Sequence, residues 1–291
     1  MSEGINFSCT LLGTGTPMVN PARACASTLV TAGDRAFLID TGRGFYNNLA
    51  ASGRQDIDLV LFTHFHSDHI AEFGELLVAR AIAGATQPLP VIGPAGANQV
   101  VAGLSAAYAL DGRYRHDHHG DKYSPAGASA EVRESAPGVV FDQDGMIITM
   151  FEVDHSPVSP AMGYRFDYQG WSIVISGDTI MVPAMIEQAT GADILVHDTM
   201  NKDMVNMGMA SIKESNPRMA AMGEEMMEYH ADRMEVARIA QEAGVKKLVL
   251  THLVPSIPPN ETMEKLFTQG MSDVYTGEII AGRDGMTVTV D

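Results

Sequence analysis

The six residues at 64–69, His-Phe-His-Ser-Asp-His, constrain this chain more than any other segment. They directly follow a short apolar run, so we expect them at a turn from a strand into a helix. In an extended segment His64 and His66 leave the same face, whereas Asp68 and His69 turn into the helix and aim at a second point. Imidazole nitrogens and carboxylate oxygens suit zinc, and manganese or iron also accept them. The motif therefore predicts ligands for two neighbouring divalent metal ions.

Three more His or Asp residues stand where predicted strands end. They are His155 after the run 146–153, Asp178 after the run 171–176 and His252 after the run 247–251. A carboxylate has two oxygens, so Asp178 is suited to bridge two ions. Taken singly, each residue also suits a cap, a turn or a surface histidine. Taken together, they complete a predicted set of seven ligands: His64, His66, Asp68, His69, His155, Asp178 and His252.

Short apolar runs predict strands, and stretches with helical spacing lie between them. Strands are expected at 5–11, 27–31, 36–40, 58–63, 91–92, 139–141, 146–153, 162–168, 171–176, 193–197, 247–251 and 286–290. Helices are expected at 72–83, 97–110, 182–189, 232–243 and 261–269. The polar segment 111–136 is expected to be a loop insertion in a single domain spanning 1–291. This order indicates an α/β fold with two central sheets and helices outside.

The charge balance bears on the partners of the protein. There are 19 Lys and Arg against 36 Asp and Glu, which gives a formal net charge of −17. This balance excludes a generally basic nucleic-acid surface and disfavours contact with anionic membranes. The early Gly13-x-Gly15 lacks a third glycine at the dinucleotide spacing, and there is no P-loop. We therefore expect no nucleotide cofactor.

The cysteine count and the hydropathy pattern indicate the compartment. Only Cys9 and Cys25 are present, which is typical of a reducing compartment. Residues 1–10 lack the basic and apolar regions of a signal peptide. The uncharged stretch 81–110 is broken by proline and glycine, so it predicts a buried strand and helix rather than a membrane span. We expect a cytoplasmic protein without membrane contact.

The motif and the three downstream residues resemble those of the metallo-β-lactamase superfamily of hydrolases, over nearly the whole chain. The resemblance implies a four-layered αββα sandwich with the site along one edge of its two sheets. It implies one metal held by His64, His66, His155 and Asp178, and a second held by Asp68, His69, Asp178 and His252. Asp40-Thr41-Gly42 also resembles the Asp-x-Gly turn of the family, which implies that Asp40 supports the metal loop without binding metal.

A narrower resemblance lies further along the chain. Tyr229-His230-Ala231-Asp232 and the helix and strand that follow are similar to the ribonuclease Z and arylsulfatase-like branch of the superfamily. The likeness implies that His230 points at the scissile group. His197-Asp198-Thr199 resembles the His-Glu-Ala-Thr motif of that branch, whose carboxylate orients the catalytic histidine. Asp198 thus stands where glutamate is usual, with a shorter reach.

These residues predict a hydrolase with two divalent metal ions, zinc first among them, that share a bridging hydroxide as nucleophile. Asp68 is expected to orient the hydroxide or take its proton, and His230 to stabilise the oxyanion or protonate the leaving group. We expect a small-molecule substrate with an ester-type bond, that is, a sulfate ester, phosphodiester or lactone. We expect no nucleic-acid partner, because the chain shows no basic, glycine-rich arm for tRNA.

Two alternatives stay open at this point. The first is a ribonuclease Z-type endonuclease acting at the 3′ end of tRNA. The second is a non-catalytic or redox metal-binding protein on the same scaffold. The methionine-rich stretch 200–227 favours core or dimer packing, and we expect a homodimer. The histidines at 116, 118 and 119 are expected to be solvated, or else to line the mouth of a pocket.

Overall fold

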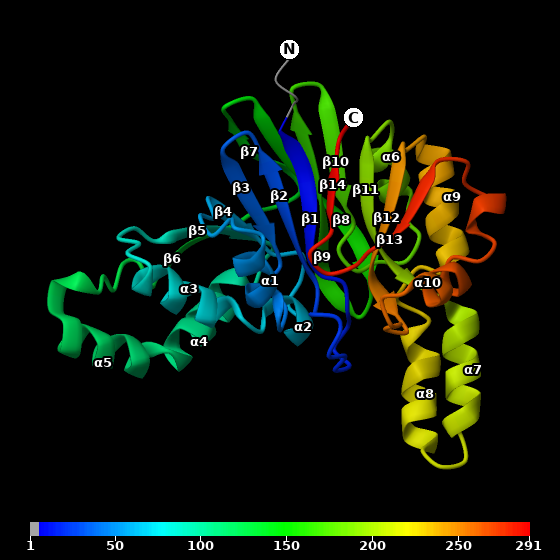
Figure 1. Cartoon of the computed structure of the whole chain (residues 1–291), viewed down its shortest axis with the longest axis horizontal. Helices are drawn as coiled ribbons and strands as arrows, with labels where there is room; N and C mark the ends of the chain where they lie inside the picture. The colour runs from blue at the N-terminus through cyan, green and yellow to red at the C-terminus, as the bar shows by residue number, and fades with distance from the viewer. Residues whose placement is uncertain (1–5) are drawn as a thin grey trace.

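In a computed structural model that describes residues 6–291, two seven-stranded sheets pack face to face (Figure 1). Ile5, the first residue of the strand predicted at 5–11, lies outside the described residues. The first sheet has the order β14 (Thr287–Thr289), β1 (Phe7–Gly13), β2 (Ser27–Ala32), β3 (Arg35–Ile39), β4 (Leu59–Leu61), β5 (Leu89–Gly93) and β6 (Ala130–Glu134). The second has the order β13 (Glu278–Ala281), β12 (Lys247–Val254), β11 (Ile194–Met200), β10 (Trp171–Ile175), β9 (Val158–Tyr168), β8 (Met146–His155) and β7 (Gly138–Gln143).

Central strands such as β10 and β11 are buried on both faces because helices or the other sheet cover them, whereas the edge strands β6 and β7 are largely exposed. In β10, Ile173 and Ile175 point into the core between the sheets, while Val174 points to the helices outside. The core between the sheets joins aromatic side chains from both of them. The ring of Phe37 in β3 lies 5.3 Å from that of Phe141 and 6.0 Å from that of Phe166. This alternation fixes which side chains of each strand face the core between the sheets.

Helices form the two outer layers. Over the first sheet lie α1 (Phe45–Ala51), α3 (Phe73–Ile82) and α4 (Ala97–Ala107), and over the second lie α6 (Pro183–Ala189), α9 (Arg233–Ala243) and α10 (Glu261–Phe267). Helix α9 begins and ends where the sequence predicts. Asp232 forms a capping box with Glu235, and Gly244 ends the helix in the left-handed conformation. The predicted four-layered αββα sandwich is confirmed.

One edge of the sandwich collects the carboxyl ends of several strands. Strands β3 and β4 are parallel neighbours in the first sheet, and β10, β11 and β12 are parallel in the second. Strand β8 runs the same way as β10, because both are antiparallel to β9. The residues that follow these strands therefore meet at the same edge, beside the short helix α2 (Ser67–Ile70).

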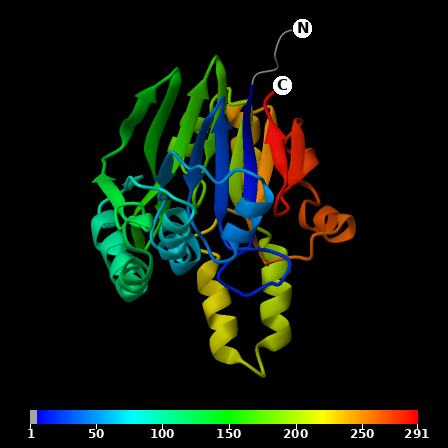
Figure 2. The same ribbon diagram turned by 60° about the vertical axis from the view of Figure 1, so that its left-hand side comes forward.

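The segment 111–136 is not the loop that its polar composition suggests. It contains most of α5 (Ala109–His119), the 3₁₀ turn Gly120–Lys122 and the edge strand β6. Helix α5 buries none of its residues, so it lacks the apolar stripe by which a helix is recognised in a sequence. The methionine-rich segment forms a helical hairpin, α7 (Lys202–Ile212) and α8 (Pro217–Met226), which projects from the body (Figure 2).

The uncharged stretch 81–110 is divided as expected between the end of α3, strand β5 and helix α4. Among residues 6–291, no helix has both the length and the apolar character needed to cross a membrane.

The inter-sheet core yields a stability prediction. Phe37→Ala should lower the free energy of unfolding by about 3–5 kcal/mol, because it leaves a cavity between two aromatic partners of the opposite sheet. Val139→Ala, which truncates a side chain that is 61% exposed, should change it by less than about 0.5 kcal/mol. Urea unfolding followed by circular dichroism measures both. Equal effects would contradict the placement of Phe37 in the core.

Candidate metal centre

Four of the predicted ligands form a first group at the sheet edge. His64 and His66 come from the loop after β4, His155 ends β8, and Asp178 follows β10. One ligand atom of each lies within 4.8 Å of those of the others. His66 Nδ1 is 3.1 Å from His64 Nε2 and 3.4 Å from His155 Nε2. The four atoms thus converge on one point.

A second group joins the remaining ligands. Asp68 and His69 lie in α2 and His252 lies in β12, and their ligand atoms are also within 4.8 Å of one another. His252 Nε2 is 3.2 Å from Asp68 Oδ2, and His69 Nε2 is 3.8 Å from the same oxygen. All seven residues that the sequence singles out therefore lie in two adjacent groups.

Asp178 connects the two groups through a single oxygen. Its Oδ2 is 3.9 Å from both His64 Nε2 and His155 Nε2 in the first group. The same atom is 3.3 Å from His69 Nε2 and 3.4 Å from His252 Nε2 in the second group. The ligand atoms of both groups therefore surround this one carboxylate oxygen.

Asp40 holds the metal loop without joining either group. Its Oδ1 accepts a hydrogen bond from the Thr63 amide at 2.9 Å, and its Oδ2 accepts one from the Thr63 hydroxyl at 2.7 Å. His69 donates from Nδ1 to Asp40 Oδ2 at 2.8 Å, which turns its Nε2 toward Asp178. Asp40 adopts a φ of 58°, a left-handed conformation that is costly for a non-glycine residue and typical of functional sites.

A β-bulge aims His252 at the site. Strand β12 pairs with β11 in register up to Thr251, and the register shifts by one residue at His252. His252 has a φ of 44°, so its backbone departs from the strand at that point. On the other side of the site, His155 donates from Nδ1 to the Tyr229 carbonyl at 2.9 Å, which directs its Nε2 toward His66. Bonds to the far nitrogen of a ligand histidine fix its orientation.

Burial and charge act against each other at the centre. Burial would raise the pKa of Asp178, but His252 and His69 around it lower that pKa well below its ordinary value. Burial lowers the pKa of His64 far below its usual range. Burial also favours neutral His252, yet the Asp178 and Asp68 carboxylates raise its pKa to about 9. The site thus concentrates carboxylate oxygen and imidazole nitrogen on buried side chains, with His66 as the one exposed member of the seven.

The donor set fits two divalent cations. Ligands bound tetrahedrally to zinc at about 2.0–2.1 Å are roughly 3.4 Å apart, and the closest ligand atoms here are separated by 3.1 to 3.9 Å. His69 Nε2 is buried and has no hydrogen-bond partner in the part of the chain described. A buried imidazole nitrogen facing a carboxylate in this way suits a ligand of a cation.

His230 stands beside the two groups and is held by Asp198. The His230 ring stacks at 5.3 Å on that of His252, and its Nδ1 donates to Asp198 Oδ2 at 2.9 Å. The aspartate therefore reaches the histidine despite its shorter side chain, because both residues are buried side by side. One ligand atom of His230 also lies within 4.8 Å of ligand atoms of Asp178 and His252.

Sequence reasoning missed two neighbours of this pair. His197 is fully buried, and its Nδ1 lies 2.6 Å from the Asp198 carbonyl and 3.1 Å from Asp198 Oδ1. Burial would raise the pKa of Asp198, but His197 and His230 lower it. The ring of Tyr229 lies 5.2 Å from that of His155 and 5.0 Å from that of His230. Both residues belong to the motifs quoted from the sequence, but those motifs gave roles only to His230 and Asp198.

A four-layered αββα sandwich with two His and Asp groups at one edge defines a metallo-β-lactamase-type hydrolase fold. Residues 35–253 match the model of the β-lactamase superfamily domain. The chain is 39% identical to ribonuclease Z of Mycobacterium bovis (strain BCG / Pasteur 1173P2) over 280 residues, which cover 94% of this chain and 95% of the relative. It is also 39% identical to ribonuclease Z of Mycolicibacterium paratuberculosis over 287 residues, 97% of this chain and 98% of the relative.

Solved structures agree on the fold. The metallo-β-lactamase fold protein YhfI from Bacillus subtilis superposes with a TM-score of 0.71 at 20% identity, over 97% of this chain and 98% of that one. The short form of human tRNase Z superposes with a TM-score of 0.70 at 19% identity, over 98% of this chain and 99% of that one. The chain belongs to the β-lactamase superfamily and, within it, to the ribonuclease Z family.

These comparisons correct two expectations. The prediction of a small-molecule ester as substrate, without a nucleic-acid partner, is wrong, because the relatives that match nearly the whole chain are named as ribonucleases. The prediction relied on the absence of a basic, glycine-rich arm and on the net charge of −17, and that charge sums over the whole surface and does not describe the site. The comparisons support the ribonuclease Z side of the predicted branch and not the arylsulfatase-like side.

The position of Asp178 between the two groups predicts that its removal weakens metal binding at both of them. After reconstitution with zinc, Asp178→Ala should retain less than half of the metal bound by the unmodified protein, because one carboxylate serves both groups. His118→Ala, which removes an exposed histidine of α5, should retain all of it. Elemental analysis after gel filtration gives the metal-to-protein ratio. If the two variants bind the same amount, Asp178 does not connect two ions.

Proposed function

We propose that this protein is a metal-dependent endoribonuclease that cuts precursor tRNA on the 3′ side of the acceptor stem. One observation carries the proposal: the buried His230–Asp198 pair lies against the seven converging ligands, in a chain that matches ribonuclease Z relatives along 94% of its length. The alternative of a non-catalytic metal-binding protein gives no role to that pair.

The proposed ligands are the two groups described above, with Asp178 common to both. Zinc is the proposed cation, because the set is rich in imidazole nitrogen. Two such ions supply a water nucleophile at neutral pH and offset the charge of a phosphodiester. The chain's own part is to hold seven ligand atoms in place by hydrogen bonds to their far sides, as Asp40 and the Tyr229 carbonyl do.

Asp68 and His230 are the proposed proton acceptor and proton donor of the reaction. When water attacks the phosphorus atom, the bond from phosphorus to the 3′ oxygen of the tRNA breaks. Asp68 is placed to take the proton of the attacking water, since its carboxylate lies among the second group. His230 donates from Nδ1 to Asp198, so Nε2 is the nitrogen left to give a proton to the departing 3′ oxygen. Asp198 keeps the ring in this orientation through that hydrogen bond.

An acidic protein is compatible with an RNA substrate on this account. Cations held by the seven proposed ligands would offset the charge of the scissile phosphate, so fewer Lys or Arg side chains would be needed there. The net charge of −17 lowers the affinity of the rest of the protein surface for RNA. We therefore expect modest binding of precursor tRNA that falls with salt.

The first test is cleavage of a precursor tRNA with a labelled 3′ trailer by the zinc-loaded protein. We expect one product ending at the 3′ side of the acceptor stem, and loss of the product after chelation. Asp178→Ala serves as the inactive control, since it removes the shared ligand. Hydrolysis of a small chromogenic phosphodiester without any cleavage of precursor tRNA would contradict the proposal.

The role of His230 gives a separate prediction. His230→Ala should lower kcat and kcat/KM together by about 10²–10⁴-fold on precursor tRNA, the usual size of general acid catalysis. Its metal content should equal that of the unmodified protein, because His230 is outside the seven proposed ligands. His119→Ala, an exposed histidine of α5, is the matched control and should keep full activity. Unchanged rates for His230→Ala would remove it from the mechanism.

A further inference from the structure

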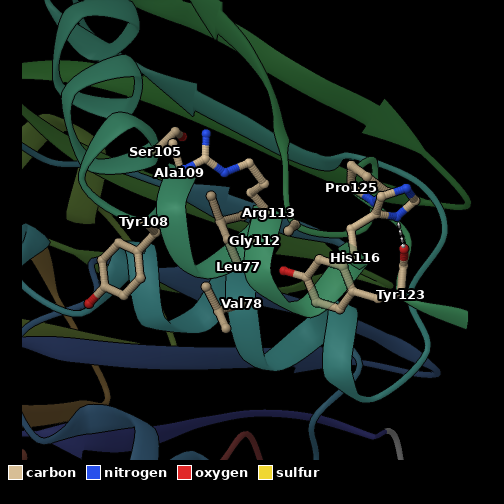
Figure 3. Close-up of a pocket in the computed structure, with 12 residues that line it drawn as sticks. Leu77, Val78, Ser105, Tyr108, Ala109, Gly112, Arg113, His116, Tyr123 and Pro125 are labelled. Carbon is tan, nitrogen blue, oxygen red and sulfur yellow. Dashed lines mark hydrogen bonds between the residues drawn. The ribbon is translucent and has the colours of Figure 1, made fainter. Parts of the chain in front are cut away.

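A cavity lies away from the metal centre, between α3 and the corner where α4 meets α5 (Figure 3). Its volume is about 290 Å³, which is near the lower end for small-ligand sites. Apolar and aromatic side chains form one part of its wall and polar side chains the other. The lining side chains include Leu77, Val78, Tyr108, Arg113, His116 and Tyr123.

Tyr123 places an unpaired hydroxyl at this cavity. Its side chain is 3% exposed, and no partner for the hydroxyl lies among residues 6–291. The other two buried tyrosines are satisfied: Tyr164 donates to the Phe62 carbonyl at 2.7 Å and Tyr275 donates to the Val245 carbonyl at 2.9 Å. An unsatisfied buried hydroxyl is costly, so the position of the Tyr123 hydroxyl points to an acceptor that comes from outside the chain.

The hydroxyl is available as a donor. Burial raises the pKa of Tyr123, and nearby Asp111 adds to the effect, so the group keeps its proton. Gly112 of α5 lies beside it, since a Cβ at that residue would be 3.7 Å from the hydroxyl oxygen, an ordinary contact distance. Figure 3 shows the ring of Tyr123 directed toward α5.

Two further donors stand at the same cavity. Arg113 has no carboxylate within 4.0 Å among the described residues, whereas its neighbour Arg115 is paired with Asp111 at 2.7 Å. His116 donates from Nδ1 to the Tyr123 carbonyl at 3.4 Å, which leaves Nε2 for a ligand. A cation and an imidazole on one side suit an anionic group.

The remaining wall suits a flat ring. Tyr108 lies against α3 over Gly74, where a Cβ would be only 2.4 Å from its ring, and Leu77 and Val78 extend the apolar surface. A ligand for this cavity therefore combines a planar ring, a hydrogen-bond acceptor on that ring and an anion. Unpaired nucleotides have these three parts, and proteins bind them by stacking and by contacts to base edges.

We propose that this cavity binds one unpaired nucleotide of the RNA substrate, with the base inside against Tyr108 and Tyr123 and the phosphate at Arg113 and His116. The inference rests on the proposed function and adds a second contact to it. Gly96, the residue before α4, lies beside Phe65 of the metal loop, since a Cβ there would be 3.1 Å from the Phe65 ring. Ser105 at the cavity is roughly 14 Å further along the helix at 1.5 Å per residue. One strand of RNA is able to reach both places.

The test uses the full chain and cytidine 5′-monophosphate as probe, followed by the amide NMR signals of Gly112 and His116. We expect saturable shifts of these signals. Tyr123→Phe and Arg113→Gln should each weaken the binding about tenfold, as for a lost hydrogen bond to a charged or buried partner. Tyr114→Phe and Arg115→Gln are the matched controls on the same helix and should bind as the unmodified chain does.

Three outcomes would overturn the proposal. The first is the absence of shifts at millimolar probe, and the second is equal binding by Tyr123→Phe, Arg113→Gln and the controls. The third is binding of ribose 5-phosphate or inorganic phosphate as tight as that of the nucleotide, which would leave only an anion site.

The same variants separate this inference from the proposed function. If precursor tRNA is cleaved but the cavity variants bind the nucleotide normally, the cavity proposal fails and the function stands. If the nucleotide binds as expected but precursor tRNA is not cleaved, the function fails and the cavity stands. If both hold, Arg113→Gln should raise KM for precursor tRNA and leave kcat unchanged, because the cavity is remote from the reacting atoms.

Discussion

The buried carboxylate of Asp178 is the interaction on which the site depends. One of its oxygens lies within 3.9 Å of imidazole nitrogens from four different histidines, and the side chain is shielded from water. A charge buried in this way is costly unless it is paired or binds a cation. The surrounding imidazoles compensate for that charge only in part, because burial lowers the pKa of His64 and of His155 and so disfavours their charged forms. Two divalent cations offset it more fully, because they satisfy the carboxylate and the imidazoles together.

The fold brings these residues together at one edge of the sandwich. Strands of both sheets end at a common edge, so short loops from distant parts of the chain supply the ligands. Two residues leave ordinary backbone geometry to do so, Asp40 with a φ of 58° and His252 with a φ of 44°. Contacts across the sandwich hold the metal loop in place: the Met162 amide donates to the Thr63 carbonyl at 3.0 Å. Such bonds keep the ligands in position and sustain the costly backbone conformations of Asp40 and His252.

Short sequence motifs predicted much of this arrangement. They did not predict features that depend on long-range packing or that lie on the surface. The ligands between His64 and His69 and the helix caps Asp232 and Gly244 are recognised from residues close by in the sequence, so they could be predicted. Helix α5 was not, because it buries none of its residues and so carries no periodic apolar stripe. The cavity at Tyr123 depends on how three helices pack, which no short motif encodes. The substrate class was misjudged because net charge averages over a surface, whereas recognition occurs at a few positions.

The most direct test of this account is the position of metal ions in the zinc-loaded protein. An anomalous difference map recorded at the zinc absorption edge locates them without assumption. The account predicts two peaks about 3.5–4 Å apart, as in other two-metal sites. Both should contact the Asp178 carboxylate, one beside His64, His66 and His155, the other beside Asp68, His69 and His252. A single peak, or two peaks of which only one touches Asp178, would contradict the central claim that this carboxylate joins two ions.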